Sequence, residues 1–259
     1  VLQIMENGLK VPEDVTLLWC DDNYGYMTRL KEKNAKQRSG GAGVYYHLSY
    51  WGRPHDYLWL CTTQPGLIYS EMKQAYDNNA RQEWIVNIHD PKPAAYDLEL
   101  FMDMAWNINS VSPSTINNHL GNWLIREFGE NAGKKLLPVM QEYYRLCGIR
   151  RPEHMGWTQV ELDKATNVRG MSWMKDTEFS NEFGGEMDRY LEHYADIKKA
   201  VEDIKQDIAD EKRDAYFSHI EYQVCAAADM ATKMLEAQRA RSYASGQTNA
   251  TLWSRDSVM

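Results

Sequence analysis

Residues 40–60 read GGAGVYYHLSYWGRPHDYLWL, and this stretch decides the fold of the first half of the chain. Its centre, GVYYHLSYW, is rich in the aromatic residues that favour strands. Glycines precede it and a Gly-Arg-Pro turn signal follows it, so the pattern predicts a single strand. A histidine buried among aromatic side chains needs a hydrogen-bond partner. The stretch therefore leaves two alternatives, an aromatic core strand or the wall of a binding site.

Two further apolar runs have the composition of buried strands, VTLLW at Val15–Trp19 and EWIVNIHD at Glu83–Asp90. Helical patterns alternate with the strands, weakly over residues 26–36 and more clearly over residues 67–78 and 94–106. This alternation predicts an α/β fold with a parallel sheet. Three strands alone would leave two exposed edges, so we expect the closing section of a larger TIM-type (β/α) barrel.

After residue 110 the strand signal disappears and helical periodicity takes over. The sequence VSPST supplies caps for a helix whose apolar positions run from Ile116 to Phe128. Pro138 is expected to kink or divide the following helix, which ends near Cys147 and Gly148.

Two longer helices are predicted further along the chain. Apolar residues recur at intervals of three and four from Met187 to Ile208, and a second helix is predicted from Arg213 to Arg241. We expect these helices to be neighbours in an antiparallel helical bundle. The predicted organisation is therefore a barrel section at residues 1–110 and a helical-bundle domain at residues 111–259.

The composition excludes several classes of protein. The net charge of −8 at pH 7 argues against a nucleic-acid partner. No apolar run approaches the ~18 residues of a membrane span, and the four cysteines show no CxxC spacing, so neither a membrane nor a metal or other cofactor is expected.

The opening sequence VLQIMENGLK lacks the layout of a signal peptide and is typical of a helix end. We therefore expect the chain to begin inside a folded domain.

Polar residues follow all three predicted strands. The strands end in CDDN at residues 20–23, in HLSYWGR at residues 47–53 and in NIHD at residues 87–90. The carboxyl ends of parallel strands meet at one edge of a sheet, and active sites of α/β folds lie there. We therefore expect a functional site at this edge, with ordinary turn chemistry as the alternative.

Each candidate residue also has a structural interpretation. Asp21 and Asp22 are candidates for an acid or base, although one of them can serve as a helix N-cap. His47 is either a core histidine bonded to a carbonyl or a site residue. Tyr50 and Trp51 beside it favour a site that holds a sugar ring against aromatic faces.

Polar residues beyond the second and third strands are harder to assign. The pairs His55-Asp56 and His89-Asp90 adjoin prolines and are interpreted as loop-fixing. Arg53 can bind a carboxylate or form a salt bridge at the rim. A metal-dependent barrel hydrolase or isomerase using Asp21, His47, His89 and Asp90 is an alternative, although no HxH or HExxH spacing supports it.

Three blocks of the sequence resemble glycoside hydrolase family 115. They are VTLLWCDDNYGYMTRL, RSGGAGVYYHLSYWGRPHDYLWLCTTQPGLIYSEM and WIVNIHDPKPAAYDLELFMDMAW, and YYRLCGIRRPEHM and EFSNEFGGEMDRY look similar more loosely. The resemblance implies a xylan α-1,2-glucuronidase, which removes glucuronic or 4-O-methylglucuronic acid side groups from xylan. It also implies a catalytic (β/α) barrel followed by a helical bundle, a xylan or glucuronoxylan oligosaccharide as partner, and a secreted or periplasmic location.

Carried onto matching positions, the resemblance implies catalytic roles for Asn23 and His47 and substrate-binding roles for Tyr50 and Asn87. We add Asp22 and Arg53 as candidate substrate-binding residues. The family is understood to act with inversion, which requires a proton donor and a separate carboxylate that activates water. The resemblance places the essential acidic residues mainly before Val1, so we expect this chain to be inactive alone. A non-catalytic carbohydrate-binding segment remains an alternative, and the long helices are compatible with a homodimer without requiring one.

Overall fold

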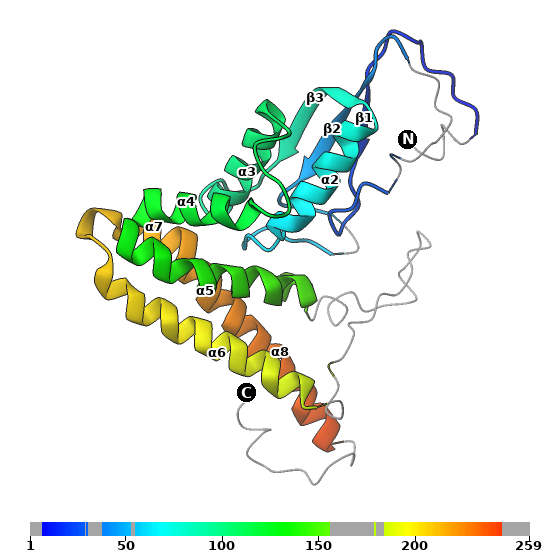
Figure 1. The fold of residues 1–259 in the computed structure, drawn as a ribbon. Helices are drawn as coiled ribbons and strands as arrows, with labels where there is room; N and C mark the ends of the chain where they lie inside the picture. The colour runs from blue at the N-terminus through cyan, green and yellow to red at the C-terminus, as the bar shows by residue number, and fades with distance from the viewer. Residues whose placement is uncertain are drawn as a thin grey trace.

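The computed structural model describes residues 7–28, 30, 38–52, 55–155, 179 and 184–244. A small sheet with its helices forms one end of this region, and long helices form the other (Figure 1). The strands are β1 (Leu17–Cys20), β2 (Ala42–His47) and β3 (Ala80–Asn87). They lie in the order β1-β2-β3, and both pairings are parallel. The structure thus confirms the three predicted strands and their parallel arrangement.

The centre of the sheet depends on a glycine. The register between β2 and β3 shifts between Ala42 and Val44, which places Gly43 at a bulge. A Cβ atom on Gly43 would lie 2.2 Å from the backbone oxygen of Glu83 and 2.7 Å from Leu18 Cδ2. Only glycine therefore allows this close approach of the strands.

Helices α2 (Pro65–Asp77) and α3 (Ala95–Trp106) cover one face of the sheet. The buried side chains of β2 and the residues just after it pack against these helices, as expected for Val44, Tyr46 and Leu48. The ring of Tyr46 stacks on that of Phe101 at a centroid distance of 6.2 Å. On the opposite face Leu18 and Ile85 are exposed.

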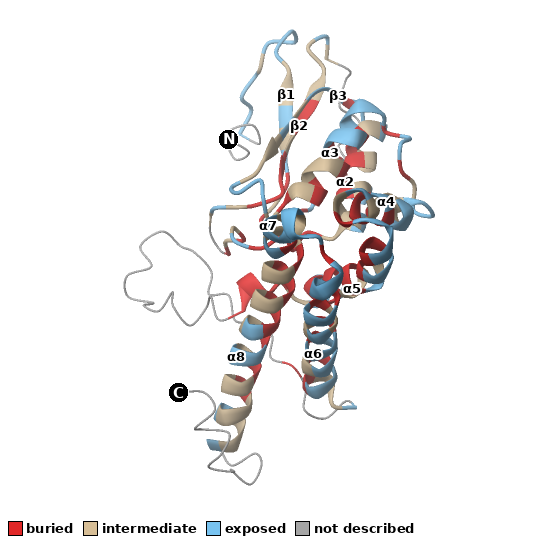
Figure 2. Ribbon diagram, turned by 90° about the vertical axis from the view of Figure 1, so that its left-hand side faces the viewer, coloured by how far each residue is buried: buried red, intermediate tan, exposed pale blue. Residues whose placement is uncertain are grey.

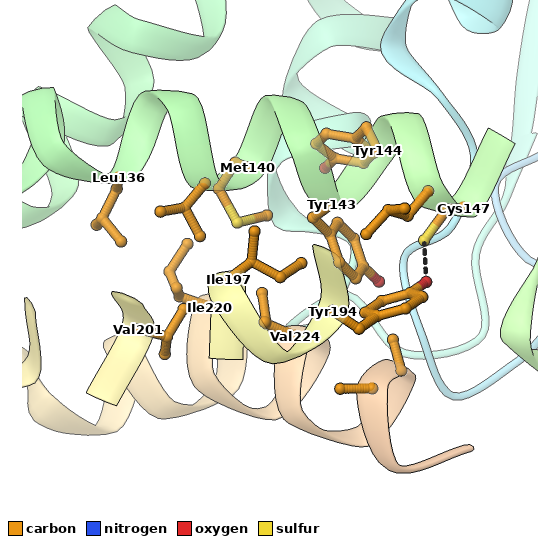
Figure 3. Packing of buried hydrophobic residues seen from close by; sticks show 14 of the residues in the cluster. Leu136, Met140, Tyr143, Tyr144, Cys147, Tyr194, Ile197, Val201, Ile220 and Val224 are labelled. Carbon is orange, nitrogen blue, oxygen red and sulfur yellow. Dashed lines mark hydrogen bonds between the residues drawn. The ribbon is translucent and has the colours of Figure 1, made fainter. Parts of the chain in front are cut away.

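The helices of the second half are α4 (Ile116–Phe128), α5 (Glu130–Ile149), α6 (Glu186–Ile204), α7 (Arg213–Tyr216) and α8 (Tyr222–Ala244). Short 3-10 turns lie at Pro152–His154, Lys205–Asp207 and Asp210–Lys212, and a π-helix at Phe217–Glu221 joins α7 to α8. Burial is concentrated where the helices face one another (Figure 2). Apolar side chains of α5, α6, the π-helix and α8 meet in one core (Figure 3), including Leu136, Met140, Tyr143, Ile197, Val201, Ile220 and Val224.

Several helix predictions need correction. Pro138 does not divide α5, because it lies on the exposed side where water can satisfy the carbonyl freed by the missing N–H. The helix predicted from Arg213 is three consecutive segments, with the π-helix in the middle. Residues 26–28 are not helical, and most of the helix predicted at 26–36 lies outside the described residues. In the described part of the chain, no helix has the length together with the apolar composition that a membrane span requires.

The two halves meet around a buried carboxyl group on α3. Asp97 is fully buried and accepts hydrogen bonds from the Cys61 thiol at 3.0 Å and the Tyr144 hydroxyl at 3.3 Å. The backbone N–H of Cys61 donates to Gln223 Oε1 on α8 at 2.7 Å. Burial raises the pKa of Asp97 to about 7, although its hydrogen bonds oppose the shift.

Replacing Asp97 by asparagine is expected to flatten the pH dependence of stability. Between about pH 4 and pH 7 the folded state keeps a proton that the unfolded state has lost, so wild-type stability falls as pH rises through this window. The loss is on the order of a few kcal/mol, and the uncharged amide avoids it. Urea unfolding at pH 5 and pH 8 measures the effect, with the exposed Asp103→Asn on the same helix as control. Equal pH dependence in wild type and Asp97→Asn would contradict this account.

Candidate active site

The ends of the three strands come together as the sequence predicts. Cys20 pairs in register with Tyr45, and His47 pairs with Asn87. The backbone N–H of Leu48 then donates to the carbonyl of Asn87 at 3.0 Å, which holds the chain beyond β2 against the end of β3. Residues that follow the strands therefore share one rim, where sites of parallel α/β folds form.

The centre of the rim is a buried aspartate–histidine pair. Asp21 Oδ1 lies 2.6 Å from His47 Nδ1, and Asp21 Oδ2 accepts the backbone N–H of His47 at 3.3 Å. The Asp21 side chain is fully shielded from solvent. An ionised carboxylate can only accept, so it fixes the proton on Nδ1 and leaves Nε2 as the nitrogen for a substrate. The sequence alone offers Asp21 as a candidate acid or base, or as a metal ligand, and the structure gives it His47 as a partner.

Burial dominates the electrostatics of this pair. It raises the pKa of Asp21, while the hydrogen bond and charge interaction with His47 oppose that rise. The Cys20 thiol lies 3.8 Å from both Asp21 Oδ1 and His47 Nδ1. Desolvation and the neighbouring carboxylate raise the pKa of Cys20 to about 11, so the thiol stays protonated at neutral pH.

Tyrosine rings form a wall around His47. The His47 ring lies 4.7 Å from that of Tyr45 and 4.6 Å from that of Tyr50, measured between centroids. Asn87 Nδ2 donates to the Tyr45 hydroxyl at 2.8 Å, so Asn87 also helps to hold this wall. Tyr57 stacks on Tyr50 at 6.0 Å, and the Tyr57 hydroxyl donates to the His47 carbonyl at 3.2 Å.

Asn23 lies at the rim, where it holds a loop. Its Oδ1 accepts the backbone N–H of His55 at 3.0 Å, and its Nδ2 donates to the carbonyls of His55 and Gly52. Asp56 Oδ1 accepts the N–H of Gly52, which confirms the loop-fixing interpretation of the His55-Asp56 pair. A Cβ atom on Gly52 would lie 2.8 Å from Tyr50 Cε1, so glycine there lets the loop pack on the ring.

Asp22 has a local structural contact as well. Its Oδ1 accepts the backbone N–H groups of Tyr24 at 2.9 Å and Tyr26 at 3.0 Å, so it fixes the turn after β1. A substrate-binding role for Asp22 therefore stays a prediction. Arg53, the other added candidate, lies outside the described residues.

The structure does not bring together the four residues that the metal-dependent alternative requires. His89 and Asp90 are exposed, and neither joins Asp21 and His47 in a group with ligand spacing. Cys20, Asp21 and His47 are the residues of this rim, in the described part of the chain, that could hold a metal ion. Their side chains are hydrogen-bonded to one another, so a metal ion would have to replace these contacts.

Sequence reasoning missed several contributors to the rim. Tyr45 and Tyr57 read as generic aromatic residues of the opening stretch, and nothing local shows that they contact Asn87 and His47. Arg151 lies far along the chain, yet its guanidinium is 4.2 Å above the centre of the Tyr57 ring. The sequence RRPEHM marks this segment as unusual without indicating its partners.

Comparison with known proteins gives a consistent result. The model of glycosyl hydrolase family 115 matches residues 1–154. A solved structure of a family GH115 4-O-methyl-α-glucuronidase, with specificity for decorated arabinogalactans, is similar at 48% identity and a TM-score of 0.81. The similarity covers 93% of this chain and 31% of that chain, so this chain spans about a third of that protein's length. None of the curated proteins matches the chain.

Proposed function

The chain belongs to glycosyl hydrolase family 115, and from this premise we propose that it supplies part of the active site of an α-glucuronidase. The substrate is a polysaccharide that carries glucuronic or 4-O-methylglucuronic acid side groups, such as decorated xylan. The observation that carries the proposal is the buried Asp21–His47 pair at the carboxyl ends of parallel strands, enclosed by tyrosine rings.

His47 is the group that we assign to the uronic acid. With the proton on Nδ1 shared with Asp21, Nε2 of the neutral ring can accept a hydrogen bond from a hydroxyl of the uronic acid. Tyr50 offers, beside His47, an aromatic face suited to the apolar face of a sugar ring. Asn87 contributes through its contact with Tyr45, and Asn23 acts by fixing the loop that carries Tyr50. These roles rest on the contacts of this rim.

We further propose that residues 1–110 are a section of a (β/α) barrel and residues 111–259 a helical domain. The parallel strands and the helices on one face support this division. So do the exposed side chains of Leu18 and Ile85, which lie on the face that a barrel would enclose. A polymeric substrate that cannot enter cells supports a secreted or periplasmic location.

The reaction that we propose is hydrolysis with inversion at the anomeric carbon. The test uses the complete enzyme that contains this chain, with aldouronic acids, glucuronoxylan and glucuronic-acid-decorated arabinogalactan as substrates. Release of the uronic acid supports the function, and NMR of the first-formed anomer reports inversion or retention. Binding without release would favour a carbohydrate-binding role, and activity lost in chelator would favour the metal-dependent alternative.

Trp51 is expected to contact the polysaccharide beyond the uronic acid. Its side chain is 83 % exposed and directly follows Tyr50, so it offers an aromatic face at the edge of the site. Trp51→Ala is expected to raise KM for decorated polymer by up to about tenfold, the equivalent of one stacking contact. Turnover of a small aryl glucuronide should not change. Trp106→Ala, at an exposed position on the end of α3, is the control. An equal loss of activity on the polymer and on the small glucuronide would reject this contact between Trp51 and the polysaccharide.

A further inference from the structure

Two buried ionisable side chains, Arg151 and Glu153, follow α5 and contact the loop at residues 57–63, which lies beside the proposed site. Glu153 is 6% exposed, and its Oε1 accepts three successive backbone N–H groups, from Leu58 at 2.7 Å, Trp59 at 2.8 Å and Leu60 at 3.2 Å. Its Oε2 accepts the hydroxyl of Thr62 at 3.2 Å. One carboxylate thus fixes the backbone of residues 58–60 and the side chain of Thr62.

Arg151 contacts the same loop through its guanidinium group. Its side chain is buried, and Nη1 donates to the hydroxyls of Thr62 and Thr63 at 3.0 Å each. Nη2 donates to the carbonyl of Tyr24 at 3.4 Å, within the turn that follows β1. The guanidinium also covers the ring of Tyr57. Arg151 therefore joins the loop to the β1 end of the rim.

The loop transmits this constraint to the site residues. Tyr57 and Tyr50 exchange two backbone hydrogen bonds, at 2.8 and 3.0 Å, in an isolated antiparallel bridge. This bridge ties the segment at Tyr57 to the segment at Tyr50. The hydroxyl of Tyr57 donates to the carbonyl of His47, and its ring stacks on Tyr50. A displacement of residues 57–60 would therefore move the ring wall against which His47 lies.

We propose that Arg151 and Glu153 are positioning residues of the active site, which act through residues 57–63 to hold Tyr57, Tyr50 and His47 in place. This role rests on the proposed function. Both charges are buried against backbone and hydroxyl groups rather than at the surface, where an ion pair would do little. Displacement by about 1 Å can lower turnover about 100-fold, even when the altered residue is far from the reacting atoms.

The test compares Glu153→Ala and Glu153→Gln in the complete enzyme. Glu130→Ala and Glu130→Gln serve as matched controls, because Glu130 is exposed at the start of α5. Glu153→Ala is expected to lower kcat about 100-fold with KM changed less than about threefold. Glu153→Gln keeps an acceptor oxygen and should recover about tenfold of that loss. Hydrogen exchange of the peptide covering residues 57–63 should increase in both variants, while that of α6 stays unchanged.

The outcomes separate the two proposals. Faster exchange at residues 57–63 with unchanged kcat would overturn the positioning role, and so would a fall in kcat that only follows global unfolding. If Glu153→Ala does not fold, Glu153→Gln and Arg151→Lys provide the same comparison, since both keep the size and polarity of the side chain. Absence of uronic acid release by the wild type would reject the proposed function, whereas release by the wild type with unchanged variants would reject only the positioning role.

Discussion

The variant His47→Ala is expected to release uronic acid about 1,000-fold more slowly than the wild type, within the range found when a positioned acid–base group is removed. The variant loses Nε2 and also leaves the buried Asp21 carboxylate without its closest partner. The measurement is kcat/KM on an aldouronic acid substrate. His193→Ala, at a half-exposed histidine on α6, is the matched control and should keep full activity.

A second substitution separates chemistry from folding at this position. His47→Asn keeps an N–H donor close to the position of Nδ1, so Asp21 stays paired, but it offers nothing in place of Nε2. We expect its thermal stability to be closer to wild type than that of His47→Ala, with activity equally low. Near-normal turnover of either variant would exclude His47 from the catalytic machinery.

Asp21→Asn should lower turnover by about 100- to 10,000-fold while leaving the fold intact. The amide can donate to Nδ1, which would place the histidine proton on Nε2 and present a donor to the substrate where the wild type presents an acceptor. Single-turnover kinetics with the wild type and the variant measure the loss. Asp77→Asn, at an exposed aspartate on α2, is the control and should keep full activity.

The pH profile gives an independent check on Asp21. Burial raises its pKa, and only the ionised carboxylate holds the proton on Nδ1. Turnover of the wild type should therefore fall as pH drops through that raised pKa, at a higher pH than a solvent-exposed aspartate would give. In Asp21→Asn this acidic limb should disappear. An unchanged acidic limb would show that another group controls it.

The sequence predicted the sheet well because its signals are local. Each strand is an apolar run that ends in polar residues, and parallel topology then requires those endings to share a rim. These local signals are enough to predict that His47, Tyr50 and Asn87 lie near one another. The same reasoning places Asn23 at the rim, but it does not predict the loop contact of Asn23, because the partners of its amide are backbone groups of Gly52 and His55, about 30 positions away.

Other features escape prediction because local rules compete with packing and solvent. Proline disfavours helix interiors, yet Pro138 is tolerated on an exposed side of α5. The π-helix at Phe217–Glu221 interrupts a segment whose apolar spacing reads as one continuous helix. Glu153 gives no local signal, since its backbone partner at Leu58 lies 95 positions away in the chain.

That separation has a consequence for how the protein is made. The loop at residues 58–62 leaves the ribosome long before Glu153, its hydrogen-bond partner. The partner of Cys61 is synthesised later still, because Gln223 lies 162 positions further along the chain. Contacts of such length close slowly, because the entropy of the intervening chain is lost before the contact forms. The rim strands can therefore pair early in synthesis, but the loop that faces them gains its final shape only after the helices have been translated. The proposed site therefore reaches its final geometry late in the biogenesis of this fold.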